Sequence, residues 1–127
     1  MGNCRKMLLI DVDKGNVQVV EIKEHEDFHR FLNCTAIGIK QKLCAGMWLP
    51  IVYDDEFLFR EELLPSAISK RTQEPAFFGN ILIAGGEEEG DISGVNEVQV
   101  RMLISEIMEA KNSEIGKKGP VLLLEDE

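Results

Sequence analysis

The sequence predicts a single α+β domain, residues 1–127, in which a mainly antiparallel sheet carries a short N-terminal helix and a longer C-terminal amphipathic helix packed on it. The length of 127 residues suits one domain, and the hydrophobic fraction of 44% is enough for a core. Short apolar or alternating runs, separated by turn residues, dominate the chain, as they do in antiparallel sheets. Two segments instead repeat apolar residues at helical spacing.

Strands are predicted where short apolar or alternating runs lie between turn residues. Gly15-Asn16 and Ala45-Gly46 mark tight turns, because Gly and Asn tolerate positive φ. Pro50 lacks an N–H for a sheet ladder, so its strand is expected at an edge or at a point where the ladder is interrupted. The predicted strands are residues 6–12, 17–22, 34–43, 47–55 and 80–84, with a terminal strand or apolar stub at 121–124, and the predicted exposed loops are 69–75 and 87–94.

The shorter predicted helix covers residues 24–33. Phe28, Phe31 and Leu32 recur at a spacing that places them on one helical face, which we expect to pack on the sheet. Asn33 is a natural end for this helix, because Asn accepts the left-handed conformation that commonly terminates helices.

The longer predicted helix covers Asn96–Lys111. Asn96 and Gln99 resemble a capping box, in which each side chain bonds the main-chain N–H of the other residue. Glu97 lies in the first turn, where the helix dipole favours a negative charge. A flexible linker is expected at 111–120, followed by an acidic C-terminal tail. The predicted apolar face consists of Val100, Leu103, Ile104, Ile107 and Met108.

Acidic residues outnumber basic ones by 23 to 14, which gives a net charge of −9. Such a chain repels nucleic-acid phosphates, so direct nucleic-acid binding is not expected, and a protein partner with a basic surface is the better electrostatic match. No apolar run approaches the roughly 20 residues that cross a bilayer, so no membrane partner and a cytoplasmic location are expected. The widely spaced Cys4, Cys34 and Cys44 indicate neither a disulfide framework nor a zinc ribbon, and no cofactor motif is found.

The stretch HEDFH matches H-E-x-x-H, the helical zinc signature of metalloproteases. In that motif two histidines one turn apart bind a single metal and the glutamate polarises the bound water, roles that His25, Glu26 and His29 would take. The chain has only two histidines, so a third ligand would have to be an acid. Asp27 is also charged where zinc proteases typically carry uncharged residues. We therefore interpret the segment as an ordinary amphipathic helix and assign neither a metal nor a catalytic residue.

Acidic side chains that gather at the end of a predicted strand and in a predicted loop form a candidate interaction surface. A cluster of this kind offers negative charge to a basic partner. At the strand end it could also form a carboxylate set for a metal or for catalysis, although a solvated strand end is the default interpretation. The residues of the candidate surface are Asp54, Asp55, Glu56, Glu87, Glu88, Glu89 and Asp91, together with the acidic tail Glu125–Glu127.

The order of the segments resembles a family of short proteins from phages, plasmids and their bacterial hosts, known only as a domain of unknown function. An N-terminal "LLI" strand, a hairpin and a short helix precede "LPIVYDD", the proline segment "LLPSAI", the strand "GNILIAG", an acidic loop and a final helix. The likeness covers about residues 6–110. Family members often carry Asn-Arg after the proline, where this chain has Ser66-Ala67. The resemblance implies a mobile-element origin and a cytoplasmic location, and it implies no activity.

These observations favour a non-enzymatic, acidic accessory protein of a mobile element or its bacterial host. Such a protein would act by protein–protein interaction, and one form of this is antagonism of a nucleic-acid-binding host protein. Two alternatives stay open. One is a small zinc-dependent hydrolase that uses HEDFH. The other is a homo-oligomerising structural module, in which Val121–Leu124 adds a strand to a neighbour's sheet.

Overall fold

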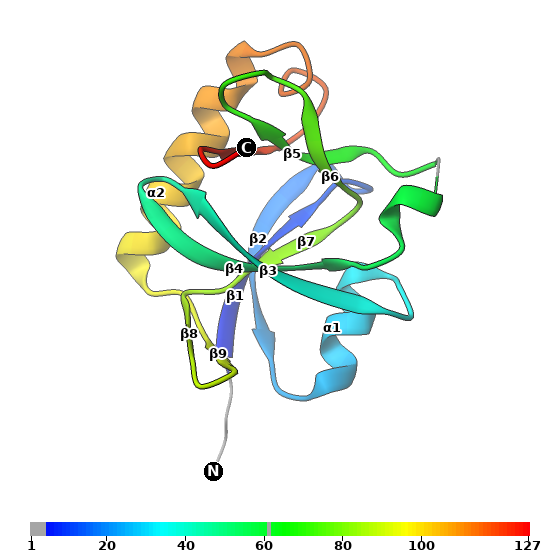
Figure 1. Cartoon of the computed structure of the whole chain (residues 1–127), viewed down its shortest axis with the longest axis vertical. Coiled ribbons are helices and arrows are strands. Elements are labelled where there is room, and N and C mark those ends of the chain that lie inside the picture. The colour runs from blue at the N-terminus through cyan, green and yellow to red at the C-terminus, as the bar shows by residue number, and fades with distance from the viewer. Residues whose placement is uncertain (1–4, 61) are drawn as a thin grey trace.

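A five-stranded antiparallel sheet forms the centre of the computed structural model, which describes residues 5–60 and 62–127 (Figure 1). The elements, in chain order, are β1 (Arg5–Asp11), β2 (Asn16–Ile22), α1 (His25–Leu32), β3 (Ile37–Cys44), β4 (Met47–Asp54), η1 (Phe57–Phe59), β5 (Pro65–Ser69), β6 (Pro75–Phe78), β7 (Ile81–Ile83), β8 (Gly86–Glu88), β9 (Asp91–Ser93), α2 (Glu97–Glu109), η2 (Ala110–Asn112) and β10 (Leu122–Leu124). The large sheet has the order β2-β1-β7-β4-β3, a smaller sheet has the order β10-β5-β6, and β8 pairs with β9. The predicted α+β class is confirmed.

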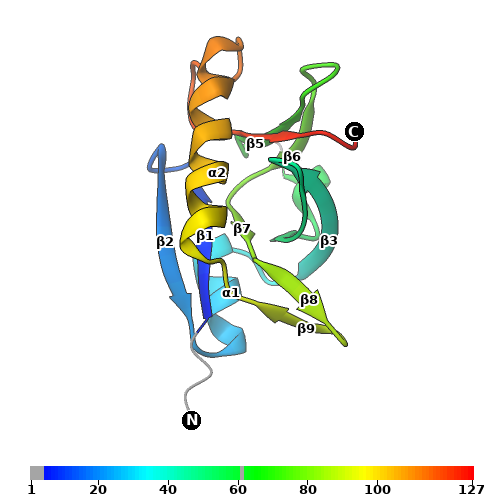
Figure 2. The ribbon, with the colours of Figure 1, turned by 90° about the vertical axis from the view of Figure 1, so that its left-hand side faces the viewer.

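Both faces of the large sheet are covered. Alternate residues of β1 enter two different cores, because successive side chains of a strand point to opposite faces. Leu8 and Ile10 pack in the core that α2 and the smaller sheet cover, whereas Met7 and Leu9 pack in the core beneath α1. The two helices accordingly lie on opposite sides of the sheet (Figures 1 and 2). β7, at the middle of the sheet, is buried along its whole length.

Tight turns connect the neighbouring strands. Ala45 and Gly46 both have positive φ, as a two-residue hairpin turn requires, and Gly15 adopts φ +70° in the β1–β2 turn. Both predicted turns are confirmed. The predicted loop 87–94 is wrong in detail, since it forms the β8–β9 hairpin with Glu89 and Gly90 at positive φ. Glutamate is uncommon in that conformation, which hides the turn from sequence inspection.

Pro50 lies in β4, an inner strand of the large sheet. The prediction that its strand lies at an edge is therefore wrong. The main chain of Pro50 faces β7, because its carbonyl accepts a hydrogen bond from the N–H of Ala84 at 2.9 Å. The N and C=O of one strand residue face the same neighbour, so the missing N–H lies just beyond Ile83, where β7 ends. The β3–β4 ladder, in which Pro50 pairs with Gln41, therefore loses no donor.

Both predicted helices are present, but the apolar face of α2 is rotated from the prediction. Asn96 and Gln99 form the expected capping box, with main-chain-to-side-chain distances of 2.8 and 2.9 Å. Leu103 and Ile107 are buried against the sheet, as predicted. Ile104 and Met108, predicted for the same face, are exposed, and 61% of Met108 is open to solvent. The helix thus presents an apolar flank that its own sheet does not cover.

The C-terminal segment is part of the domain. β10 pairs in parallel with β5 of the same chain and is completely buried. The tail then crosses to the β3–β4 hairpin, where the N–H of Glu125 donates to Leu43 at 2.7 Å and the Asp126 carboxylate accepts from the N–H of Leu43 at 3.1 Å. The terminal strand is confirmed. Residues 113–119 form bends and turns after η2, and the flexibility expected for residues 111–120 stays a prediction.

We expect the substitution Leu124→Ala to lower the free energy of unfolding by about 2–5 kcal/mol, because it leaves a cavity in the core beneath α2. The matched control is Leu58→Ala, which truncates a leucine that is 78% exposed and is expected to change stability by less than about 0.5 kcal/mol. Urea denaturation followed by circular dichroism measures both values. Equal stabilities for the two variants would show that β10 is not part of the core.

Candidate functional site

The HEDFH segment forms the first turns of α1, and its two histidine rings lie close together. The ring centroids of His25 and His29 are 5.1 Å apart. Nδ1 of His29 lies 3.2 Å from the carbonyl oxygen of Cys34, because Asn33 in the left-handed conformation turns the chain back over the helix end. Glu26 is exposed in the first turn. Within residues 5–60 and 62–127, no three His, Cys, Asp or Glu side chains are placed to hold one metal ion.

Asp27, the second acid of the segment, caps the helix. Its carboxylate accepts hydrogen bonds from the N–H groups of Lys23 at 2.8 Å and Glu24 at 3.0 Å, and it pairs with Arg30 at 2.8 Å. The hydrogen bond from Arg30, followed by those from the main chain, lowers the pKa of Asp27 from 3.8 to about 2. The segment therefore uses one of its charged groups to begin the helix.

Asp54 was predicted as part of the interaction surface, and this is wrong because only 2% of the residue is exposed. One carboxylate oxygen pairs with Arg60 at 2.8 Å, and the other accepts the N–H of Glu56 at 2.9 Å. Arg60 also donates to the carbonyl of Asn33 at 3.1 Å. Asp54 thereby ties the end of β4 to the end of α1 and to η1, which is a structural role.

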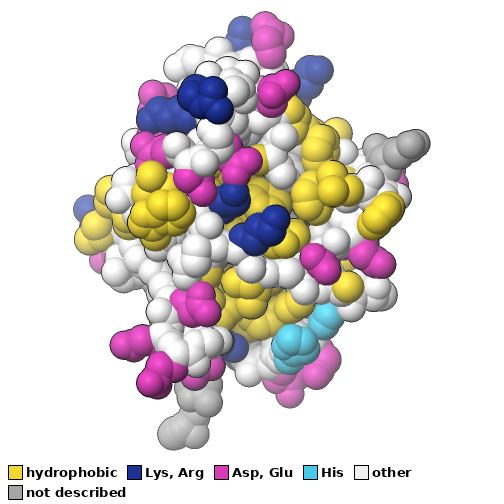
Figure 3. All heavy atoms as spheres, viewed as in Figure 1, with side chains coloured by type: hydrophobic (Ala, Val, Ile, Leu, Met, Phe, Trp, Pro, Cys, Tyr) yellow, Lys and Arg dark blue, Asp and Glu magenta, His cyan; other side chains and the backbone are white. Residues whose placement is uncertain are grey.

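Asp55 and Glu56 are exposed, but they lie far from the acidic hairpin. The hairpin meets the sheet near Gln41, whose side chain donates to Glu87 and whose strand partner is Pro50. Asp55 follows Pro50 by five residues, a separation of about 16 Å along an extended strand. Figure 3 agrees, since the acidic side chains over the hairpin lie apart from those beside η1. The predicted surface is therefore two separate groups.

The acidic tail is compensated within the chain. Asp126 lies 3.7 Å from the Lys42 ammonium, which also pairs with Glu127. Glu125 lies 3.8 Å from the Lys70 ammonium and accepts the N–H of Gly46 at 2.7 Å. These contacts dock the tail on the β3–β4 hairpin and on the loop after β5. The tail consequently does not extend the acidic surface.

Of the acidic groups in the predicted surface, the β8–β9 hairpin is the larger one without ion-pair partners within residues 5–60 and 62–127, and Asp55 with Glu56 is the smaller. Among the residues that the structure describes, no lysine or arginine forms an ion pair with its four acids, which are Glu87, Glu88, Glu89 and Asp91. Ile92 is buried beneath the hairpin in the α1-side core. Its carbonyl accepts from the Arg5 guanidinium at 3.0 Å. The hairpin is thus anchored at its base and exposes four carboxylates, and it projects from the body of the molecule (Figures 1 and 2).

Sequence inspection missed the exposed apolar side chains. Leu58 and Phe59 on η1 are 78% and 84% exposed, and Val98 and Met102 on α2 are also exposed. The sequence does not reveal that these side chains are exposed, because a hydrophobic residue type does not indicate whether the fold covers it. The described cysteines, Cys34 and Cys44, are free, and burial raises their thiol pKa values to about 11 and about 12, which makes them poor nucleophiles.

Comparisons with models of protein families, with curated proteins and with solved structures found no match to this chain. The resemblance to the phage and plasmid family therefore stays a prediction. Along the described ranges, none of the helices combines the length and the apolar character that crossing a membrane requires.

We expect Asp54→Ala to lower the free energy of unfolding by about 1–3 kcal/mol, because it leaves the Glu56 N–H and part of the Arg60 guanidinium without partners. Glu56→Ala, which truncates the exposed neighbour, is expected to change stability by less than about 0.5 kcal/mol. Chemical denaturation measures the difference. If Asp54→Ala is as stable as Glu56→Ala, the buried pair has no structural role.

The Asp27 cap predicts a pH-dependent stability. Because the folded pKa of Asp27 lies below the unfolded value of 3.8, the unfolded state binds more protons on acidification. The stabilisation is present above pH 3.8 and is lost as the pH falls towards about 2. We expect Asp27→Asn to lower the thermal midpoint at about pH 6 and to leave it nearly unchanged at about pH 2. A gap of the same size at both pH values would contradict the capping role, and Glu26→Gln serves as the control.

Proposed function

We propose that this protein is a non-enzymatic binding protein that presents the β8–β9 hairpin to a partner with a basic surface. The observation that carries this proposal is the electrostatic contrast within the chain. Asp54 and the tail Glu125–Glu127 have cationic partners, whereas the hairpin acids have none among the described residues. Acids that a fold leaves unpaired on an anchored, projecting element are suited to recognition of another molecule.

The geometry of the hairpin supports recognition of a surface more than it supports chemistry. Three of the four acids lie on the β8–β9 ladder and Glu89 lies in its two-residue turn with Gly90, so the backbone that carries the carboxylates is fixed and little backbone entropy is lost when a partner binds. The carboxylates stand in solvent, where their charge steers association and sets specificity, and each contact contributes modestly to affinity. Binding should therefore weaken steeply as the salt concentration rises.

The class of partner follows from the same charges. The four carboxylates of the hairpin offer negative charge to the lysines and arginines with which a nucleic-acid-binding protein holds phosphates. Occupation of those side chains would compete with the nucleic acid. This agrees with an accessory protein of a mobile element, or of its bacterial host, that acts in the cytoplasm on a nucleic-acid-binding host protein.

We expect the triple variant E87Q/E88Q/E89Q to capture at least about threefold less basic protein than the unaltered chain does. The probe is the soluble protein of a nuclease-treated bacterial lysate, passed over immobilised full-length protein at low ionic strength. Quantitative mass spectrometry of the bound proteins, sorted by isoelectric point, gives the measurement. Circular dichroism checks that the variant is folded.

The control variant is E26Q/E74Q/E114Q, which removes the same number of charges from exposed glutamates away from the hairpin. If binding depends on the hairpin, this control retains capture. Equal losses in the two triple variants would mean that only net charge matters, and no loss in either would remove the hairpin from any role in binding.

A further inference from the structure

The two edges of the large sheet are treated differently. The β3 edge carries Lys40 and Lys42, and the C-terminal tail hydrogen-bonds to Leu43 on it. The β2 edge has seven residues in unbroken register with β1, no proline and no bulge. Proteins usually protect an exposed edge with lysines, prolines, bulges or a covering segment, because unpaired main-chain groups recruit another strand. β2 is therefore an edge that is open to pairing.

The residues of β2 that face outward can be identified from β1. The Lys6 carbonyl accepts the N–H of Val95 at 2.7 Å, on the side of β1 away from β2. Lys6 and its β2 partner, Glu21, therefore do not exchange main-chain hydrogen bonds. In an antiparallel ladder every second pair is of this kind, so the pairs that contain Val19 and Val17 also lack these hydrogen bonds. These two valines consequently direct their N–H and C=O groups to the open edge.

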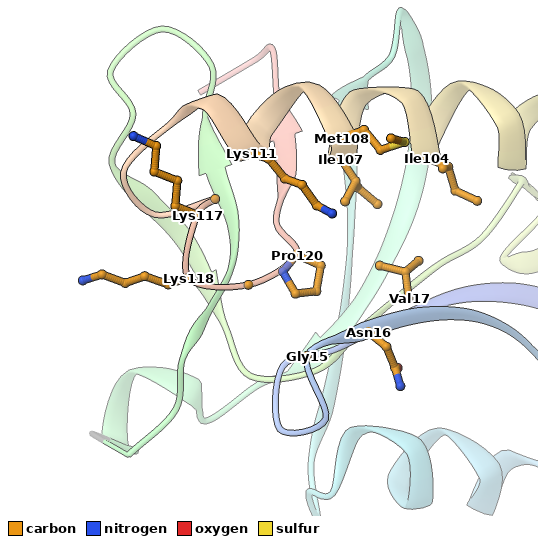
Figure 4. Close-up of a pocket in the computed structure, with 12 residues that line it drawn as sticks. Gly15, Asn16, Val17, Ile104, Ile107, Met108, Lys111, Lys117, Lys118 and Pro120 are labelled. Atoms are coloured by element: carbon orange, nitrogen blue, oxygen red, sulfur yellow. The ribbon is translucent and has the colours of Figure 1, made fainter.

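A cleft of about 630 Å³ lies beside this edge, between β2, α2 and the turns of residues 116–120. Val17 points up from the strand towards Ile104 and Ile107 of the helix, and Lys111 reaches into the cleft from its far end (Figure 4). Met108 lines the cleft and is largely exposed. The open edge and the uncovered flank of α2 thus form one continuous surface, because Val17 of β2 and Ile104 and Met108 of α2 line the same cleft.

The flank of α2 is complementary to itself. Four residues lie within about 40° of Ile104 around the helix axis, because they are four or seven residues away from it. They are Glu97, Val100 and Met108 of α2 and Lys111 of η2, which follows α2 directly. Ile104 is at the centre of this set. An apolar residue lies four positions before it and another four positions after it, and the acid Glu97 and the base Lys111 lie seven positions before and after it. Among the described residues, neither Glu97 nor Lys111 has an ion-pair partner.

We propose that a second copy of this chain docks on the surface formed by β2 and α2. A two-fold axis perpendicular to the sheet, passing between the two β2 strands, makes the strands antiparallel and joins two sheets into one. The same axis sets the two α2 helices antiparallel. Ile104 then meets Ile104, Val100 meets Met108, and Glu97 meets Lys111 at both ends of the contact. The outward valines Val17 and Val19 pair with each other across the axis.

The charge pattern favours a second copy over a foreign strand. An unrelated strand would need only the open edge and an apolar groove. The acid at one end of the α2 flank and the base at the other are matched by an antiparallel copy of the same helix. This proposal is independent of the acidic hairpin, so either proposal can fail without the other.

Sedimentation velocity of the full chain tests the proposal from about 1 to about 200 μM. We expect a dimer at twice the chain mass of 14.3 kDa. Met108→Lys should raise the dissociation constant at least about tenfold, because it places a charge in the apolar contact. Met102→Lys is the matched control, since this methionine is on the opposite flank of α2 and is 40% exposed. A monomer at every concentration, or equal effects of the two substitutions, would overturn the proposal.

A charge exchange separates a second copy from any other occupant. Glu97→Lys and Lys111→Glu should each weaken the dimer, because each places like charges opposite one another. The double variant E97K/K111E restores opposite charges and should recover most of the affinity of the unaltered chain. Loss of dimer in the double variant equal to the summed losses of the single variants would contradict the antiparallel α2 contact, provided that circular dichroism finds all three variants folded.

Discussion

The requirement that organises this fold is the burial of a sheet that is apolar on both faces. β1 and β7 send large aliphatic side chains to each side, so neither face can stay in water. Covering one face takes α1 and the β8–β9 hairpin, and covering the other takes α2 and the smaller sheet. The short helix α1 depends on this packing. It buries only Phe28 and Leu32 and would not be stable alone, so the sheet that it covers also holds it in place.

Much of this arrangement is local and could be read from the sequence. The turns at Gly15 and at Ala45-Gly46, the helix end at Asn33 and the α2 cap at Asn96 are set by neighbouring residues, and each was predicted. The parallel pairing of β10 with β5 joins segments more than fifty residues apart, and nothing local encodes it. The face of α2 was misjudged for a related reason. A helical period gives the width of an apolar stripe, whereas the sheet beneath decides which part of the stripe is covered.

The candidate site was predicted less well, because a run of acids does not reveal its surroundings. Asp54, Asp55 and Glu56 look equivalent in the sequence, yet Asp54 is buried and holds Arg60, and its neighbours are exposed. The tail Glu125–Glu127 looks like a free acidic end, but lysines at positions 42 and 70 compensate it. Both corrections depend on contacts between residues distant in the chain. The net charge of −9 is therefore a poor guide to where negative charge is available.

The open β2 edge and the acidic hairpin lie on different sides of the molecule, β2 at one margin of Figure 2 and β8–β9 at the other. A dimer joined through β2 and α2 would leave both hairpins exposed and hold them at a fixed separation. Two weak electrostatic contacts on one rigid body bind a repeated basic surface far more tightly than one contact does, because the second contact forms at a high effective concentration. A partner that presents basic side chains periodically, as a symmetric nucleic-acid-binding protein does, would gain most from this arrangement. Modest individual contacts from the hairpin would then suffice for recognition, and dimerisation would set their combined strength.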